Sequence, residues 1–166
     1  FELSRVKAHI GKQTRLKALL LHELVTDTAL ALNLKWLFDR YVKFMKRLGV
    51  APGFETRNFP ILAERLEEWG LDSERLVVAA PFNLVGFQMN PSKDTCEKAL
   101  ANVRGLEVIA ISILAAGYLR LPEALNYVES LPKLAGVVVG VSNPEQAVES
   151  FKTLRKRFPH LQEDLG

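Results

Sequence analysis

The sequence has little of three things: cysteine, net charge and long apolar runs. Its single cysteine, Cys96, excludes an internal disulfide and is typical of a reducing compartment, so we expect a cytoplasmic protein. No apolar run reaches the ~18 residues that a membrane span needs, and no signal peptide opens the chain. The net charge is only +3, which gives no reason to expect a nucleic-acid partner.

Charge is spread evenly along the chain except near its end. A basic cluster is formed there by Lys152, Arg155, Lys156 and Arg157. It falls in the last turns of a predicted helix, where cations interact favourably with the negative end of the helix dipole. We therefore interpret the cluster as helix-end charge and expect neither nucleic acid nor a membrane as a partner.

The chain repeats one pattern five times: a short apolar segment, a turn and an amphipathic helix. The strands are expected at 16–24, 50–56, 75–82, 106–114 and 135–141, and the helices at 29–48, 58–69, 91–105, 122–130 and 144–158. Proline lies near the first turn of four of these helices, where the N–H that it lacks would be unpaired anyway. Strands that alternate with helices predict an α/β fold with a parallel sheet and right-handed crossovers.

Two architectures fit five such units in a single α/β domain spanning 1–166. One is a five-stranded, flavodoxin-like doubly wound sheet. The other is the C-terminal part of a (β/α)8 TIM barrel, which needs ~250 residues when complete. We favour the barrel because a helix-like segment at 1–15 precedes the first strand and because the strands begin about 30 residues apart. The barrel predicts that N-terminal βα units are missing from this chain or from its structure.

A resemblance to known families supports the barrel. The segment ISILAAGYLRLPEALNYVESLPKLAGVVVGVSNPEQAVESF (111–151) is similar to the last two units of TIM-barrel proteins of the phosphate-binding type. It implies that loops bearing Gly117, Gly140 and Ser142 hold a phosphate. The segment GVVVGVSNPEQAVESF (136–151) also resembles the C-terminal segment of aldo-keto reductases. This resemblance implies a nicotinamide cofactor. The catalytic Asp, Tyr, Lys and His of that family have no match in this chain, and the sequence identifies no cofactor.

In either architecture a ligand is expected at the carboxyl ends of the strands. Because side chains alternate along a strand, one parity of each strand faces one side of the sheet. With small residues taken as markers, that parity is Ala18, Leu20 and His22; Gly53, Glu55 and Arg57; Ala79, Pro81 and Asn83; Ala110 and Ser112; and Val138, Gly140 and Ser142. Each of the five sets ends in a polar residue, which predicts a polar ring at the carboxyl ends.

The most reactive group in this ring is His22 with Glu23 and Glu55. A histidine and carboxylates on neighbouring strands can supply a general acid or base, or part of a divalent-metal site, or a purely structural hydrogen bond. We take His22 and Glu55 as the catalytic candidates and assign no metal ligand. Arg57 either binds an anionic group of a ligand or forms an ordinary ion pair.

The remaining ligand-binding candidates lie in loops. Asn83, Gln88 and Asn90 belong to the longest loop, where they can orient a ligand. Ser142 and Asn143 precede a helix, where backbone N–H groups bind anions but where Ser and Asn also serve as plain caps. Nucleophile elbow, Walker loop and zinc-ligand spacings are all absent from the sequence, and no lysine lies at a strand end.

Three hypotheses about function follow. The first is a small-molecule enzyme of TIM-barrel type that acts on an anionic or phosphorylated substrate at the carboxyl ends of the strands. The second is an aldo-keto-reductase-like, NADP-dependent oxidoreductase. The third is a non-enzymatic part of a barrel that pairs with another chain through its open sheet edges, which includes association between copies of this chain.

Overall fold

The computed structural model describes residues 15–71, 76–132 and 134–158. The helix-like segment expected at 1–15 therefore lies, except for Arg15, outside the described residues. The strands are β1 (Ala18–Leu21), β2 (Ala51–Glu55), β3 (Leu76–Pro81), β4 (Leu106–Ile111) and β5 (Leu134–Val137). The helices are α2 (Glu23–Ala31), α3 (Lys35–Arg47), α4 (Phe59–Glu68), α5 (Lys93–Asn102), the 3-10 turn η1 (Ala115–Gly117), α6 (Leu121–Ser130) and α7 (Pro144–Arg157).

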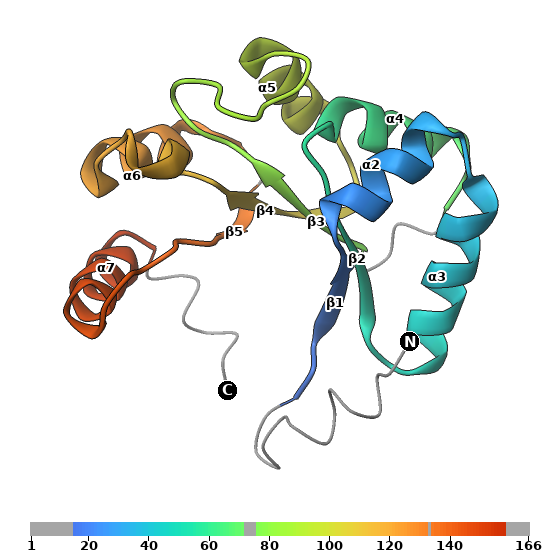
Figure 1. Ribbon diagram of the computed structural model, residues 1–166, viewed down its shortest axis with the longest axis horizontal. Coiled ribbons are helices and arrows are strands. Elements are labelled where there is room, and N and C mark those ends of the chain that lie inside the picture. Colours follow the sequence, from blue (N-terminus) through green and yellow to red (C-terminus); the bar gives the residue numbers. More distant parts are fainter. Residues whose placement is uncertain (1–14, 72–75, 133, 159–166) are drawn as a thin grey trace.

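The five strands form one all-parallel sheet in the order β1-β2-β3-β4-β5 (Figure 1). The prediction of alternating βα units with a parallel sheet is thereby confirmed. Each strand pairs with the next strand along the chain, so the spatial order contains no reversal. The carboxyl ends of all five strands consequently lie at one edge of the sheet, which we call the carboxyl edge.

The helices form an arc on one side of the strands, and none of the described helices lies on the opposite side (Figure 1). The core between strands and helices contains one parity of the strand residues, including Phe54, Val78 and Val108, all fully buried. Helix α3 shows why this packing forms, because Phe38 and Val42 recur at helical spacing and contact the same core. The other parity of the sheet forms its helix-free face.

The helix-free face is closely packed around Gly53 in β2. A Cβ atom at this position would lie 2.7 Å from Cγ of Leu20 in β1 and 3.0 Å from the carbonyl oxygen of Val77 in β3. Both distances are shorter than side chains normally tolerate, so β2 requires glycine where its neighbours approach. The glycine that interrupts this strand in the sequence is explained by that contact.

The helix predicted over 29–48 is in fact two helices, and its predicted start is wrong. Helix α2 begins at Glu23, because His22 ends β1 and caps the helix, with Nδ1 accepting a hydrogen bond from the Leu24 N–H at 3.2 Å. Asn33 adopts a left-handed backbone with φ of 52°, which separates α2 from α3. The predicted strand 106–114 is likewise too long, since Ser112, with φ of 53°, follows the last residue of β4.

The predicted facing of β4 is also wrong. Ala79 pairs with Ile109 and Pro81 with Ile111, so these residues share the helix-free face. Ala110 points the other way and is fully buried in the core under the helices. The small size of Ala110 therefore reflects packing against helices rather than an inward position at a site.

Candidate functional site

An ion-pair network joins the ends of β1 and β2 at the carboxyl edge. Glu23, the first residue of α2, contacts Arg57, which follows β2. The guanidinium binds the carboxylate in a bidentate manner, with Nε donating to Oε2 at 2.7 Å and the second nitrogen contacting Oε1. Of the two readings that the sequence allows for Arg57, the geometry thus corresponds to the ion pair.

Asp27 extends this network one turn further along α2. Its carboxylate accepts hydrogen bonds from the hydroxyl of the buried Thr56 and from the backbone N–H of Arg57, the latter at 3.1 Å. The Thr56 hydroxyl also accepts a hydrogen bond from the Asn58 N–H at 2.9 Å. Because every one of these groups is engaged, the network fixes the loop after β2 against α2.

His22 and Glu55 lie at the same level on neighbouring strands. In the parallel register Leu20 pairs with Gly53 and Leu21 with Phe54, so His22 and Glu55 are the next residues along the two chains. Glu55 belongs to the helix-free parity of β2, whereas His22 follows the last residue of β1. The half-buried carboxylate of Glu55 has no hydrogen-bond or ion-pair partner among the described residues. It is therefore available to a ligand.

The imidazole of His22 is held by the helix that it caps. Since Nδ1 accepts a hydrogen bond from the Leu24 N–H, we assign the proton of the neutral ring to Nε2. His22 is exposed, so this Nε2–H can donate to a bound molecule. Glu55 as an acceptor and His22 as a donor are complementary groups for acid–base chemistry.

Asn83 holds the loop after β3 through its side-chain amide. Its side chain is fully buried, with Nδ2 donating to the Phe87 carbonyl at 2.8 Å and Oδ1 accepting from the Phe87 N–H at 2.7 Å. The Met89 sulfur accepts a hydrogen bond from the Asn83 N–H at 3.4 Å. Gln88 follows with a left-handed backbone, φ of 60°. The loop is thus closed on itself by a buried amide.

The loop after β4 contains three of the five non-glycine residues with positive φ in the described chain. Ser112, Ala115 and Ala116 all have positive φ values, of 53°, 47° and 57°, and Gly117 follows with 89°. Residues other than glycine are strained in this conformation. Such strain is retained most often in loops that have a function. The Gly117 N–H donates to the Leu114 carbonyl at 2.9 Å and is therefore already engaged. The predicted phosphate site at this loop stays a prediction, and it would need a different hydrogen-bond donor.

The start of α7 is a closed cap. Asn143 accepts a hydrogen bond from the Gln146 N–H at 2.8 Å, and the Gln146 side chain in turn accepts one from the Ser142 N–H at 2.8 Å. Gly140 and Ser142 are exposed, and a Cβ atom at Gly140 would meet no neighbour within 4 Å. An anion at this helix start would have to replace the side chain of Gln146.

A shallow apolar cleft lies between the loops that follow β3 and β4 at the carboxyl edge. Its volume is about 390 Å³, and it is lined by Val85, Phe87, Ala115 and Tyr118. The first two come from the loop after β3, and the other two from the loop after β4. Sequence reasoning missed it, although apolar residues within NLVGFQMN, a loop otherwise expected to be polar, were a visible signal.

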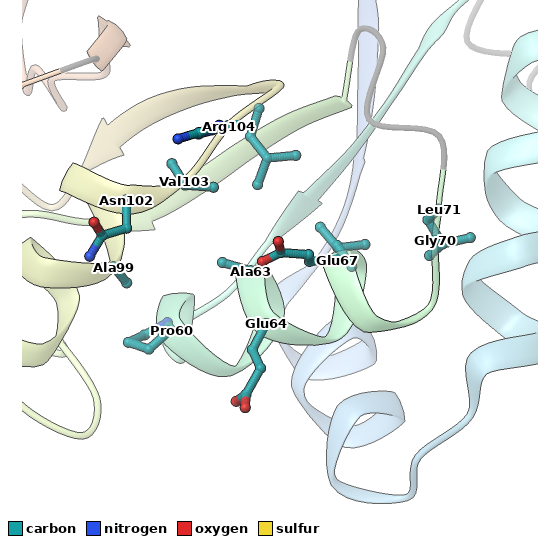
Figure 2. A pocket seen from close by; sticks show the side chains of 12 residues that line it. Pro60, Ala63, Glu64, Glu67, Gly70, Leu71, Ala99, Asn102, Val103 and Arg104 are labelled. Atoms are coloured by element: carbon teal, nitrogen blue, oxygen red, sulfur yellow. The ribbon is translucent and has the colours of Figure 1, made fainter.

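A second hollow, of about 730 Å³, lies at the opposite end of the sheet between α4 and α5. Figure 2 shows the carboxylate of Glu64 turning away from Arg104, which lies across the hollow. This hollow is the larger of the two, yet it adjoins the amino end of β4, where residues usually serve stability. We therefore place the candidate site at the carboxyl edge.

Neither a metal cluster nor a relative defines this site further. Across 15–71, 76–132 and 134–158, no three His, Cys, Asp or Glu side chains are grouped to hold a metal ion. No helix in the same ranges combines the length and hydrophobicity needed to cross a membrane. Comparison of the sequence with protein-family models and with curated proteins finds no match.

Proposed function

We propose that this chain is the C-terminal part of a (β/α)8-type barrel and acts as a small-molecule enzyme at its carboxyl edge. The strand order supports the barrel, because a flavodoxin-like sheet has the order 2-1-3-4-5 and this sheet has no such reversal. The single-sided arc of helices also supports it, since a doubly wound sheet carries helices on both faces (Figure 1).

The observation that carries the proposed activity is the position of Glu55 and His22 at the ends of neighbouring strands. In the proposed reaction Glu55 accepts a proton from the substrate while Nε2–H of His22 donates a hydrogen bond to a substrate oxygen. The pairing of Glu23 with Arg57 and of Asp27 with Thr56 would act as support, because it holds the loop that follows Glu55. The proposal thus gives each group at the ends of β1 and β2 one role.

The proposed substrate is anionic or phosphorylated, with its anion at the start of α7. A phosphate oxygen is a stronger acceptor than an amide oxygen and would gain from the positive end of the helix dipole. It would therefore displace the Gln146 side chain from the Ser142 N–H. The nicotinamide-dependent alternative rests on the sequence resemblance alone, and a fluorescence titration with NADPH tests it.

The experiment begins with a turnover screen of the whole chain against phosphorylated and carboxylate-bearing metabolites. For any substrate found, Glu55→Gln should lower kcat by 100-fold or more, since general base catalysis contributes roughly 10² to 10⁴. His22→Asn, which keeps a capping acceptor for α2, should lower kcat while leaving the far-UV circular dichroism unchanged. Glu107→Gln, an exposed carboxylate on the same face of β4, is the matched control. Unchanged turnover in both variants would remove the proposal.

A second candidate function is association through the sheet edges. Val138, at the end of β5 on the helix-free parity, is 54% exposed, and β1 and β5 each have one unpaired side among the described strands. An unpaired strand next to exposed apolar surface favours pairing with another chain. Hydrogen exchange of β1 and β5 at two protein concentrations tests this candidate.

A further inference from the structure

Helix α3 concentrates positive charge at one end of the arc of helices (Figure 1). Its sequence contains five cations and one carboxylate, an excess of four, whereas the whole chain has a net charge of only +3. The even spread of charge expected from the sequence therefore does not hold for α3. The small net charge conceals a strongly basic helix in a chain that is otherwise close to neutral.

Three of these cations form a stripe along α3. Arg40, Lys43 and Arg47 follow one another at intervals of three and four residues, which places them on one helix face, and all three are exposed. None of them forms an ion pair within the part of the chain that the structure describes. Asp39, the one carboxylate of α3, is half-buried and bonds to none of them. We call these three cations the basic stripe.

The basic stripe continues at its start into exposed apolar side chains. Trp36 precedes Arg40 by four residues and is 58% exposed, with the Arg40 guanidinium lying 5.9 Å from the centroid of its ring. Leu32, on the α2 side of the turn at Asn33, is 63% exposed. Large apolar side chains and cations without ion-pair partners thus lie together at the turn between α2 and α3.

Helix α2 extends this apolar surface because its charges are used elsewhere. Glu23 and Asp27 are its only charged residues, and both bond to residues that end or follow β2. The exposed residues of the helix are all uncharged: Leu24, Val25, Thr28 and Ala31. An apolar outer face of this kind usually marks a surface that meets a partner.

An anionic lipid surface is the partner that uses both kinds of side chain. Its headgroups attract cations, while Trp and Leu side chains become buried at the boundary between headgroups and acyl chains. A nucleic acid also attracts the basic stripe, but exposed leucines gain nothing from a phosphodiester backbone. A second copy bound through the same face would bring two basic stripes together, which the repulsion between like charges opposes.

We propose that the basic stripe, together with Trp36 and Leu32, binds the surface of an anionic phospholipid bilayer. The cations contact lipid headgroups, the two apolar side chains insert between them, and the contact needs no spanning helix. This inference goes beyond the proposed function and does not depend on it, since neither Glu55 nor His22 belongs to this surface. It replaces the expectation, drawn from the net charge and the C-terminal basic cluster, that no membrane is a partner.

The test is co-sedimentation of the whole chain with vesicles of two compositions. Binding to phosphatidylcholine vesicles that contain about one quarter phosphatidylserine should be at least about tenfold tighter than binding to phosphatidylcholine alone, because each cation near an anionic surface contributes a factor of about five. Raising the salt from about 0.1 to about 1 M should weaken binding, since the Debye length falls from about 10 to about 3 Å. Equal binding to the two kinds of vesicle, or binding to neither, overturns the proposal.

Two matched double variants separate the basic stripe from net charge. Arg40→Gln combined with Lys43→Gln should weaken binding to the phosphatidylserine vesicles about 25-fold. Lys152→Gln combined with Lys156→Gln removes two exposed cations from α7 and should weaken it less than about threefold. Equal losses in the two double variants would mean that total charge alone attracts the vesicles, which contradicts a site on α3. Far-UV circular dichroism verifies that both variants are folded.

Trp36 reports directly on insertion. Its emission should move to shorter wavelength on phosphatidylserine vesicles, whereas Trp36→Phe, which leaves Trp69 as the one tryptophan, should bind without this shift. Binding of the unaltered chain without a shift would rule out insertion and with it the proposed contact. If a labelled oligothymidine instead binds and displaces the chain from the vesicles, the surface is a nucleic-acid site and the proposal fails.

Discussion

Cys96 shows how burial alone can determine the chemistry of one residue. The side chain is 1% exposed within α5, and its thiol donates a hydrogen bond to the Asn90 carbonyl at 3.3 Å. Burial, with a smaller contribution from the charge of Glu97, raises the pKa of the thiol to about 11. A raised pKa means that the folded protein keeps the thiol proton more firmly than the unfolded chain.

We predict that iodoacetamide alkylates Cys96 about 100-fold more slowly in the folded protein than in urea at about pH 8, because the thiolate is about 100-fold rarer. The raised thiol pKa also contributes to the free energy of unfolding. That contribution is fully present below the thiol pKa of the unfolded chain. It is lost as the pH rises from there through about 11. Mass spectrometry of the alkylated chain measures the rates, and equal rates in the two states would contradict the burial of Cys96.

Single residues also show where sequence reasoning stops. His22 and Glu55 were predicted because both fall at strand ends, which local patterns locate. Arg57 left two alternatives open, since its partner Glu23 comes from another βα unit and depends on how α2 lies over β2. Asn83 was predicted to bind a ligand, whereas its amide bonds to the Phe87 backbone inside the protein. Partners of polar side chains are set by packing that no local spacing encodes.

At the scale of elements, the loop after β4 combines a required turn with unfavourable residues. Ala116 has φ of 57° within η1, and its side chain is exposed. Alanine loses roughly 1 kcal/mol in this conformation, whereas glycine adopts it freely. The backbone of Ala116 is therefore strained in this turn.

We predict that Ala116→Gly raises the free energy of unfolding by about 0.5 to 1 kcal/mol, since it removes this strain. Urea denaturation measures the change. Ala99→Gly, in the middle of α5, is the control and should lower the free energy of unfolding by about 1 kcal/mol. If both variants lose stability equally, the left-handed conformation of Ala116 is not strained.

Element boundaries illustrate a second limit of the sequence. A stripe of apolar residues predicted one helix over 29–48, but the left-handed Asn33 divides it into α2 and α3. The stripe continues on both sides of the break, so its periodicity does not reveal the interruption. The starts of α4, α6 and α7 were better predicted, because each has proline within its first two residues.

At the scale of the whole molecule, the central strand of the sheet is more deeply buried than the two edge strands. All six residues of β3 are buried, and this strand is paired on both sides. The edge strands β1 and β5 have four residues each and are only partly buried apart from one exposed position. Local opening is easiest where few buried contacts must break.

We predict that amides of β3 exchange with solvent at least about tenfold more slowly than those of β1 and β5, as measured by hydrogen–deuterium exchange. Exchange in β3 should not depend on protein concentration, which makes this strand the internal control. Protection of β1 and β5 that grows with concentration would support association through the edges. Protection that stays constant would count against that association.

The all-parallel α/β sheet was predictable because each strand, turn and helix has its own local signal. How one strand faces relative to its neighbours was harder to predict from the sequence. Ala110 shows this: its small side chain suggested a position facing the site, whereas the register with β3 turns it toward the helices. The apolar cleft depends on two loops about 30 residues apart in the sequence. Only the packed structure brings such loops together.

The sequential strand order also bears on how this chain is made. Leu21 pairs with Phe54 and Ala79 with Ile109, so each new strand meets its partner within about 30 residues of synthesis. During translation, every strand would emerge from the ribosome after the strand that templates it, at about 5 to 20 residues per second. The sheet can therefore grow one unit at a time behind the ribosome, because each new strand adds to the edge of the strand made just before it.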